Sequence, residues 1–160
     1  MSCHFYKLNL PPPGFSSWTK LRLNWIAPAK VVTVNPGETA TISLGPLADR
    51  ALDTLVIKIP LSPTTYYLIE NRQSIGLDEN LPDSGVLILY ADDTVAECLR
   101  GQAPVKIVDA DPSVPQLEGA AFDIGQGKRN TFTDEEHNIT IQLLEKVDHS
   151  YEILITRAQE

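Results

Sequence analysis

Apolar and polar residues alternate with a period of two through most of the chain beyond Pro28. In residues 39–44, for example, the apolar side chains at every second position are separated by threonine and serine. Successive side chains of a strand point to opposite faces of a sheet, so this period predicts β-strands that bury one face. The predicted strands cover residues 31–34, 39–44, 54–59, 65–73, 85–91, 105–108, 138–144 and 151–156.

Turn-forming residues separate these strands. Asn35-Pro36-Gly37-Glu38 places proline and glycine where tight turns use them. Residues 145–150 have the length of a hairpin connection, whereas residues 109–137 are rich in Gly, Pro, Asp and Glu and are predicted to form one long loop. Short strands with frequent turns are typical of all-β folds, and we predict an antiparallel, jelly-roll-like β-sandwich.

Before Pro28 the pattern is different. Residues 8–14 contain three consecutive prolines and are predicted to be extended. Large apolar residues then recur at a spacing of three to four, which predicts a short helix near residues 16–24, capped by Ser16 or Ser17 and ended by Pro28. The apolar stripe of this helix consists of Phe15, Trp18, Leu21 and Trp25.

A helix of this length is not stable alone, so its apolar stripe must dock on something. We expect it to dock on the sandwich of the same chain, where burial of Trp25 would make the removal of its side chain costly. The chain therefore divides into an N-terminal extended segment with a short helix, residues 1–28, and a β-sandwich domain, residues 29–160.

Composition argues against two classes of partner. The 160 residues carry a formal net charge of −8, and the only basic pair is Lys128-Arg129, so long-range electrostatics oppose binding to nucleic acids. No apolar run approaches the roughly 20 residues of a membrane-spanning helix, so we expect no membrane insertion. The first residues lack the features of a signal peptide, so a secreted parent would carry its signal upstream.

The chain lacks the residue patterns of common catalytic and metal sites. Its three histidines, His4, His137 and His149, form no His-Glu-x-x-His motif, and there is no Cys-x-x-Cys pair or Gly-x-Ser-x-Gly elbow. Cys98 could be drawn as a dyad with His137 or His149, but any chain with these residue types allows that. We therefore predict no catalytic, cofactor-binding or metal-binding residues, and no enzymatic activity in the isolated chain.

Some polar residues leave two interpretations open. Glu70 and Arg72 either line a substrate groove or form a cross-strand ion pair, and the ion pair is favoured because buried charges are costly unless paired. The many loop carboxylates are either solvated or bind calcium. Asp109 and Asp111 are the best-spaced pair, although no calcium-loop pattern is present.

Two further features are left open as well. Cys3 and Cys98 either form a disulfide or stay separate, because the sequence does not give the distance between them. Asn138-Ile139-Thr140 fits the acceptor pattern for N-glycosylation, a triplet that is common by chance.

The most specific motif lies in residues 66–88. It consists of Tyr66-Tyr67-Leu68-Ile69-Glu70-Asn71-Arg72-Gln73, then Gly76, Asp78, Leu81-Pro82, Ser84-Gly85 and Leu87-Ile88. Together with residues 13–26, which precede it, and residues 105–111, 121–125, 132–134 and 138–144, which follow it, this motif resembles the region that follows the catalytic core in secreted zinc metallopeptidases of the immune-inhibitor-A type. Asn24 stands where that family usually has glycine.

The resemblance implies that the chain is a non-catalytic, C-terminal β-sandwich of a metallopeptidase-like protein, located outside the cell or at its surface. Its partner would be the catalytic domain of the parent protein, on which it would pack while also helping to recruit substrate. The alternative is an independent module that binds carbohydrate or a cell surface. Sugar sites present aromatic faces, so an exposed row of aromatic side chains would favour that alternative.

Overall fold

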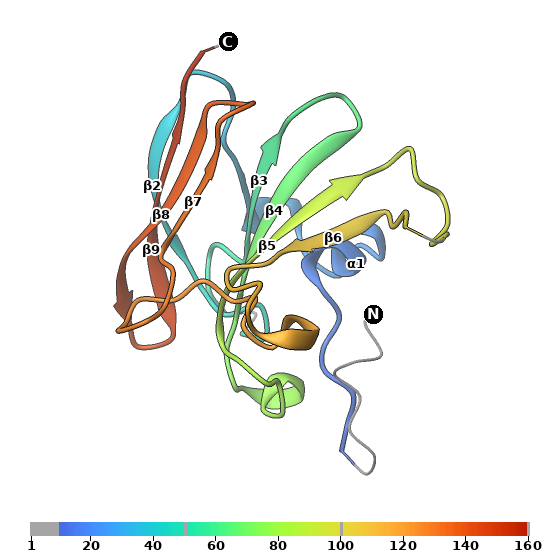
Figure 1. Ribbon diagram of the computed structural model, residues 1–160, viewed down its shortest axis with the longest axis vertical. Coiled ribbons are helices and arrows are strands. Elements are labelled where there is room, and N and C mark those ends of the chain that lie inside the picture. Colours follow the sequence, from blue (N-terminus) through green and yellow to red (C-terminus); the bar gives the residue numbers. More distant parts are fainter. Residues whose placement is uncertain (1–9, 50, 100, 160) are drawn as a thin grey trace.

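The computed structural model describes residues 10–49, 51–99 and 101–159, in which two β-sheets pack against each other (Figure 1). The strands are β1 (Val31–Thr33), β2 (Thr39–Leu44), β3 (Val56–Pro60), β4 (Thr65–Arg72), β5 (Gly85–Asp92), β6 (Val105–Val108), β7 (Thr131–Asp134), β8 (Ile139–Val147) and β9 (Ser150–Arg157). The helical elements are the α-helix α1 (Ser17–Arg22) and the 3-10 turns η2 (Pro28–Lys30), η3 (Gly76–Asp78) and η4 (Pro115–Leu117).

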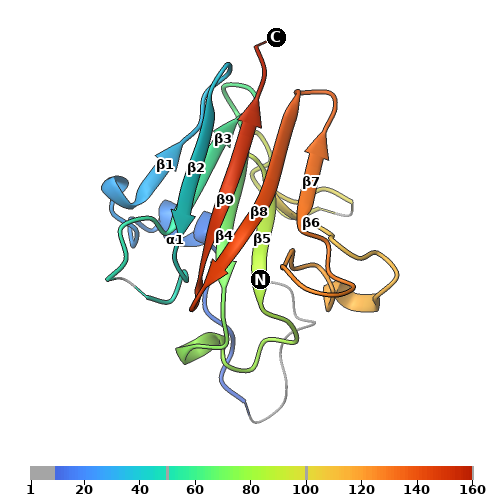
Figure 2. The ribbon, with the colours of Figure 1, turned by 90° about the vertical axis from the view of Figure 1, so that its left-hand side faces the viewer.

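The five-stranded sheet has the order β1-β3-β4-β5-β6, and the four-stranded sheet has the order β2-β9-β8-β7 (Figure 2). Strands β1 and β3 run parallel, because the chain crosses to β2 in the other sheet between them, and the other paired strands are antiparallel. This architecture confirms the predicted antiparallel β-sandwich. Its meanders, β3 to β6 and β7 to β9, are simpler than the two Greek keys of a jelly roll.

The main core lies between the two sheets and takes its side chains from both. Ile69 and Ile88 of the five-stranded sheet meet Ile141, Ile153 and Ile155 of the four-stranded sheet, and all five are fully buried. Ile141, Ile153 and Ile155 belong to the apolar half of alternating segments, whereas Ile69 and Ile88 lie in strands that are apolar on both faces. The period of two therefore identifies the half of this core that comes from the four-stranded sheet.

The outer face of the five-stranded sheet is apolar as well. Val56, Leu68 and Leu89 are at most 2% exposed and belong to a second apolar cluster on this face. Trp18 and Leu21 of α1 pack against that cluster and help to cover the sheet. The prediction that the short helix docks on the sandwich of its own chain is confirmed.

Helix α1 begins where the sequence predicts and ends earlier. Ser16 is the N-cap, and its hydroxyl accepts a hydrogen bond from the Thr19 backbone N–H at 3.4 Å. The last helical residue is Arg22, and Asn24 adopts a left-handed conformation with φ of 56°. Asparagine tolerates this conformation, so it turns the chain out of the helix before Pro28 is reached.

The early end of α1 overturns the predicted role of Trp25. This residue lies beyond the helix with 49% of its surface exposed, whereas the adjacent Ile26 is 6% exposed and belongs to the second cluster. The apolar stripe predicted from helical spacing includes Trp25, but the helix ends at Arg22. The expectation that Trp25 is buried against the sandwich was therefore wrong, which removes the basis for expecting a large loss of stability when its side chain is removed.

Two predicted loops are shorter in the structure. Within residues 109–137, β7 pairs with β8, and Phe132 lies opposite Ile141 and contacts the Tyr67 ring edge-on at 5.5 Å. Four residues with one large apolar side chain were too short to show a clear period. The predicted connection at residues 145–150 is reduced to a turn at Asp148 and His149, because β8 and β9 extend into it.

Candidate functional site

A buried ion-pair cluster lies at the end of β4 on the outer face of its sheet. Arg72 donates from Nη1 to Glu70 Oε1 at 3.0 Å, and from Nε and Nη2 to the two oxygens of Asp78 at 2.8 and 2.6 Å. Burial lowers the pKa of Arg72, but the charge of Glu70 and the hydrogen bonds to Asp78 outweigh this effect and raise it. We call Glu70, Arg72 and Asp78 the clasp; it contains one carboxylate more than it contains cations.

The clasp holds the N-terminal segment on the sheet. The Gly14 N–H donates to Asp78 Oδ1 at 2.9 Å, and the Gly14 carbonyl accepts from Arg72 Nη2 at 2.8 Å. The Ser17 N–H at the start of α1 donates to Glu70 Oε2 at 2.5 Å. The N-terminal segment therefore meets β4 and the loop after it, more than 50 residues further along the chain, at one set of buried charges. These charges are stable there because each is paired and hydrogen-bonded.

Glu70 and Arg72 form an ion pair and also line a cavity, so each of the two interpretations describes part of what the structure contains. The ion pair is confirmed, although it runs along a single strand and not across two strands. Both residues also line a cavity on the outer face of the sheet. Asn71 points to the other side of the sheet, where its amide donates to the carbonyls of Leu44 at 3.1 Å and His149 at 2.7 Å and joins the two sheets.

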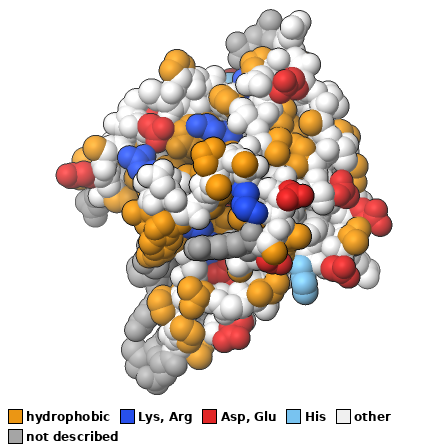
Figure 3. Space-filling model, turned by 180° about the vertical axis from the view of Figure 1, so that it is seen from behind, with side chains coloured by type: hydrophobic (Ala, Val, Ile, Leu, Met, Phe, Trp, Pro, Cys, Tyr) orange, Lys and Arg blue, Asp and Glu red, His pale blue; other side chains and the backbone are white. Residues whose placement is uncertain are grey.

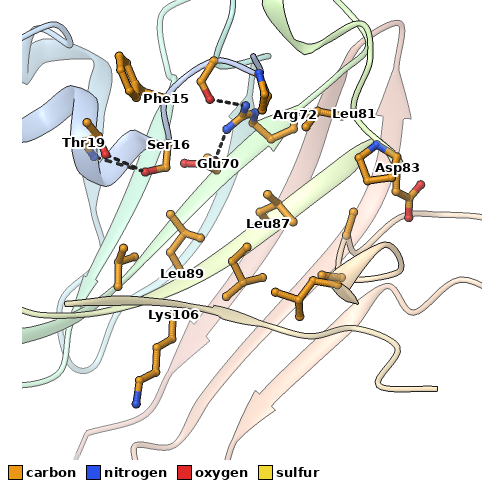
Figure 4. A pocket seen from close by; sticks show the side chains of 18 residues that line it. Phe15, Ser16, Thr19, Glu70, Arg72, Leu81, Asp83, Leu87, Leu89 and Lys106 are labelled. Atoms are coloured by element: carbon orange, nitrogen blue, oxygen red, sulfur yellow. Dashed lines mark hydrogen bonds and ion pairs between the residues drawn. The ribbon is translucent and has the colours of Figure 1, made fainter. Parts of the chain in front are cut away.

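The cavity beside the clasp has a volume of about 420 Å³ (Figure 4). Its floor is formed by Leu87 and Leu89 of β5 and by Val105 and Ile107 of β6. The walls come from residues 13–16 with Thr19, from residues 81–83, and from Leu117, Ala120 and Ala121. We call this cavity the cup. Its size and mostly apolar lining are typical of sites that hold small molecules or protruding side chains.

The polar groups of the cup gather at its clasp end. The Ser16 and Thr19 hydroxyls lie 3.4 Å apart, beside Glu70 (Figure 4). Two other charged residues of the lining are directed elsewhere. Lys106 points away from the floor, and Asp83 Oδ2 accepts from Lys128 at 2.7 Å.

An exposed apolar patch adjoins the cup. The rings of Phe15 and Trp25 pack with their centroids 5.6 Å apart, and Leu23 and Trp25 are 47% and 49% exposed. We call Phe15, Leu23 and Trp25 the apolar patch. Phe15 also lines the cup, so the two features are continuous. Hydrophobic side chains gather on the side of the molecule that carries α1 and β1, which faces the viewer in Figure 3. Exposed apolar surface of this kind marks contact sites in proteins.

A second polar cluster links the two sheets elsewhere. The Tyr67 hydroxyl of β4 donates to Asp134 Oδ2 of β7 at 2.9 Å, and His137 Nδ1 lies 2.8 Å from the same oxygen. Burial raises the pKa of Asp134, but hydrogen bonds from His137 and Tyr67 outweigh this effect and lower it. Burial raises the pKa of Tyr67. We call Tyr67, Asp134 and His137 the sheet latch.

The residues considered for a cysteine–histidine dyad are not brought together. Cys98 lies between β5 and β6, His137 between β7 and β8, and His149 between β8 and β9. The two histidines are at opposite ends of β8, and His137 contacts Asp134. The loop that carries Cys98 lies apart from both turns in Figure 1 and in Figure 2.

The loop carboxylates singled out for calcium stabilise turns. Asp109 Oδ1 accepts from the Asp111 N–H at 3.1 Å, and Asp111 Oδ1 accepts from the Ser113 hydroxyl at 2.6 Å. The hydrogen bonds from the Ser113 hydroxyl and backbone N–H lower the pKa of Asp111. Within the residues that the structure describes, no three His, Cys, Asp or Glu side chains are grouped so that they could hold a metal ion.

Cys98 is exposed, while Cys3 and His4 lie outside the described residues, so the Cys3–Cys98 disulfide stays a prediction. Asn138 is exposed in a turn with φ of 52°. None of the helices in the described ranges has both the length and the apolar character needed to cross a membrane.

No protein-family model matches the chain, and no curated protein is significantly similar to it. The resemblance to immune-inhibitor-A-type metallopeptidases therefore stays a prediction.

The sequence analysis does not predict the cup, although the sequence contains two apolar runs that point to a covered sheet face. Residues 85–91 and 105–108 are apolar at most positions, which is typical of strands covered on both faces. Such runs predict that something covers the outer face of the sheet. They do not identify the walls, which depend on how the clasp positions a segment more than 50 residues away in the sequence.

Proposed function

We propose that the chain is a non-catalytic β-sandwich accessory domain that packs on a partner domain through the apolar patch. The partner would be the catalytic domain of a metallopeptidase-like parent, as the resemblance of the sequence implies. The chain would then act outside the cell or at its surface, where it stabilises the catalytic domain and helps to recruit substrate.

The exposed side chain of Trp25 is the observation that carries this proposal. Tryptophan is enriched among the residues that dominate binding energy at protein interfaces, because its large apolar surface gains much from removal of water. Trp25 is held against Phe15, so its position is fixed before a partner arrives. A preorganised aromatic side chain loses little conformational entropy on binding.

The proposal that the apolar patch is a contact surface can be tested with the purified chain. Without its partner, the chain should self-associate through the patch, and its average mass by light scattering should rise with concentration. Trp25→Ser should suppress this rise. Leu144→Ser is the matched control, since Leu144 is 47% exposed on β8 of the other sheet. A constant monomer mass for the unmodified chain, or equal effects of both variants, would count against the proposal.

The non-catalytic part of the proposal has a separate test. We expect no cleavage of casein by the purified chain and no stoichiometric zinc by metal analysis. Casein cleavage that a chelator abolishes, accompanied by one tightly bound zinc per chain, would refute it.

A carbohydrate-binding module is the second candidate, and the exposure of Trp25 is the observation that favours it. Sugar rings stack on exposed aromatic faces, and Trp25 offers one at the surface. Titration with cellohexaose, xylohexaose and chitohexaose, followed by tryptophan fluorescence, tests this function. A saturable change that Trp25→Ala removes would support the sugar-binding module in place of the accessory domain.

A further inference from the structure

We propose that the cup binds a small apolar amine, with its ammonium group at the clasp end and its apolar chain on the floor formed by β5 and β6. This site belongs to the chain itself and does not depend on a partner domain. Two properties of the cup support this inference. Its lining is mostly apolar, and the net charge of the clasp beneath one end is negative.

The shape suits one small apolar molecule. The volume of about 420 Å³ lies within the range of small-molecule sites, and the lining is mostly apolar. Leu87, Val105 and Ile107 are only half-buried, so a ligand would remove apolar surface from water. The walls on three sides would hold an extended chain along the floor.

The charge at the clasp end favours a cation over an anion. The N–H groups of Gly14 and Ser17 already donate to Asp78 and Glu70. The bonds of Arg72 go to those same carboxylates and to the Gly14 carbonyl, so its charge is more than matched. Two carboxylates share one guanidinium, so the clasp has a net formal charge of −1 in a poorly solvated place, where electrostatic interactions are stronger than in water.

The same end provides acceptors for an ammonium group. The 3.4 Å separation of the Ser16 and Thr19 hydroxyl oxygens is longer than an ordinary O–H···O hydrogen bond, so the bond between them is easily exchanged. Both hydroxyl oxygens have lone pairs, and an ammonium group has three donors. An amine head is therefore complementary to this end in charge and in hydrogen bonding, whereas a carboxylate head is not.

Three probes with the same apolar chain test the proposal, namely n-octylamine, n-octanol and sodium octanoate. Binding to the purified chain is followed by NMR chemical shifts of backbone amides. Octylamine should bind saturably, about tenfold more tightly than octanoate, and should perturb amides of β5, β6 and residues 14–19. Equal or tighter binding of octanoate, or no saturable binding of octylamine, would overturn the proposal.

Two variants with equal charge changes distinguish binding in the cup from non-specific adsorption of a cation to an acidic protein. Val105→Arg places a cation in the floor and should reduce octylamine binding at least tenfold. Thr133→Arg adds the same charge at an exposed position of β7 in the other sheet and should change the affinity less than about twofold. Equal weakening by both variants would show surface adsorption and would overturn the proposal.

A milder variant keeps the test valid if Val105→Arg does not fold. Thr19→Val retains the shape of the side chain and the Ser16 cap but removes one hydroxyl acceptor. It should weaken octylamine binding at least about tenfold, the loss expected for one hydrogen bond to a charged group. Unchanged affinity in a folded Thr19→Val chain would contradict the placement of the ammonium group.

Discussion

Arg72 shows most clearly how single residues organise this molecule. It is 6% exposed, and its guanidinium joins a strand, the loop after it and the segment that precedes α1. Buried charges are tolerated only as complete sets, so the clasp should be sensitive to the loss of its one cation.

Arg72→Met should therefore lower the free energy of unfolding by about 3–5 kcal/mol, because it leaves Glu70 and Asp78 buried together without a counter-ion. Arg22→Met is the control. Arg22 pairs with Asp93 at 3.1 Å, but both side chains are well exposed, at 55% and 41%. Such a surface pair contributes up to about 1 kcal/mol. Urea unfolding of the three proteins measures both differences; similar losses in the two variants would refute the account of the clasp.

The sheet latch predicts a specific dependence on pH. Hydrogen bonds from His137 and Tyr67 hold the pKa of Asp134 below its unfolded value of about 3.9. A depressed carboxyl pKa stabilises the fold above the unfolded pKa, and this contribution is lost as pH falls through the folded pKa. Asp134→Asn should therefore be less stable than the unmodified chain at pH 6, and the difference should shrink below about pH 4. Unfolding free energies across this range check it; a difference that does not vary with pH would exclude this origin.

At the scale of elements, the short helix is stabilised by what it covers. Trp18 and Leu21 pack on the outer face of the five-stranded sheet, and Ile26 follows them into the same cluster. The Tyr66 hydroxyl and Arg22 both contact Asp93 at 3.1 Å, which adds a polar link at the edge of this interface. Burial and Asp93 together raise the pKa of Tyr66 to about 12.

Neighbouring residues beyond α1 should therefore respond very differently to truncation. Ile26→Ala should cost about 2–4 kcal/mol, since it removes buried apolar volume from a packed site. Trp25→Ala should cost less than about 1 kcal/mol, since half of that side chain is already in water. Thermal or urea unfolding of the two variants measures both effects, and an equal or larger loss for Trp25→Ala would contradict the observed packing.

The limits of sequence reasoning are clearest at this same scale. Alternation identifies strands such as β2, β8 and β9, because burial of one sheet face imposes a period of two. The end of α1 was misplaced because the left-handed turn at Asn24 carries no periodic signal. Strand β7 was missed because its pairing with β8, and not its own composition, makes it a strand. The clasp was recognised as an ion pair, but its third member, Asp78, comes from a loop whose path the sequence does not give.

At the scale of the whole molecule, the two faces of the five-stranded sheet have different roles. The inner face packs against the four-stranded sheet and makes the core, while the outer face carries α1, the cup and the apolar patch. The clasp ties the N-terminal segment to this outer face and so builds one wall of the cup. Features with potential to bind other molecules are thus concentrated on one side of the sandwich, in keeping with the proposed accessory role.

The most direct test of that role is hydrogen–deuterium exchange. Backbone amides of residues 13–26 are compared in the isolated chain and in the longer polypeptide that includes the segment encoded immediately upstream. If the chain packs on a catalytic domain through the apolar patch, these amides should exchange at least about tenfold more slowly in the longer polypeptide. Amides of the turn at Asp148 and His149 serve as the control and should exchange equally in both. Identical exchange of residues 13–26 in the two polypeptides would contradict the proposed function.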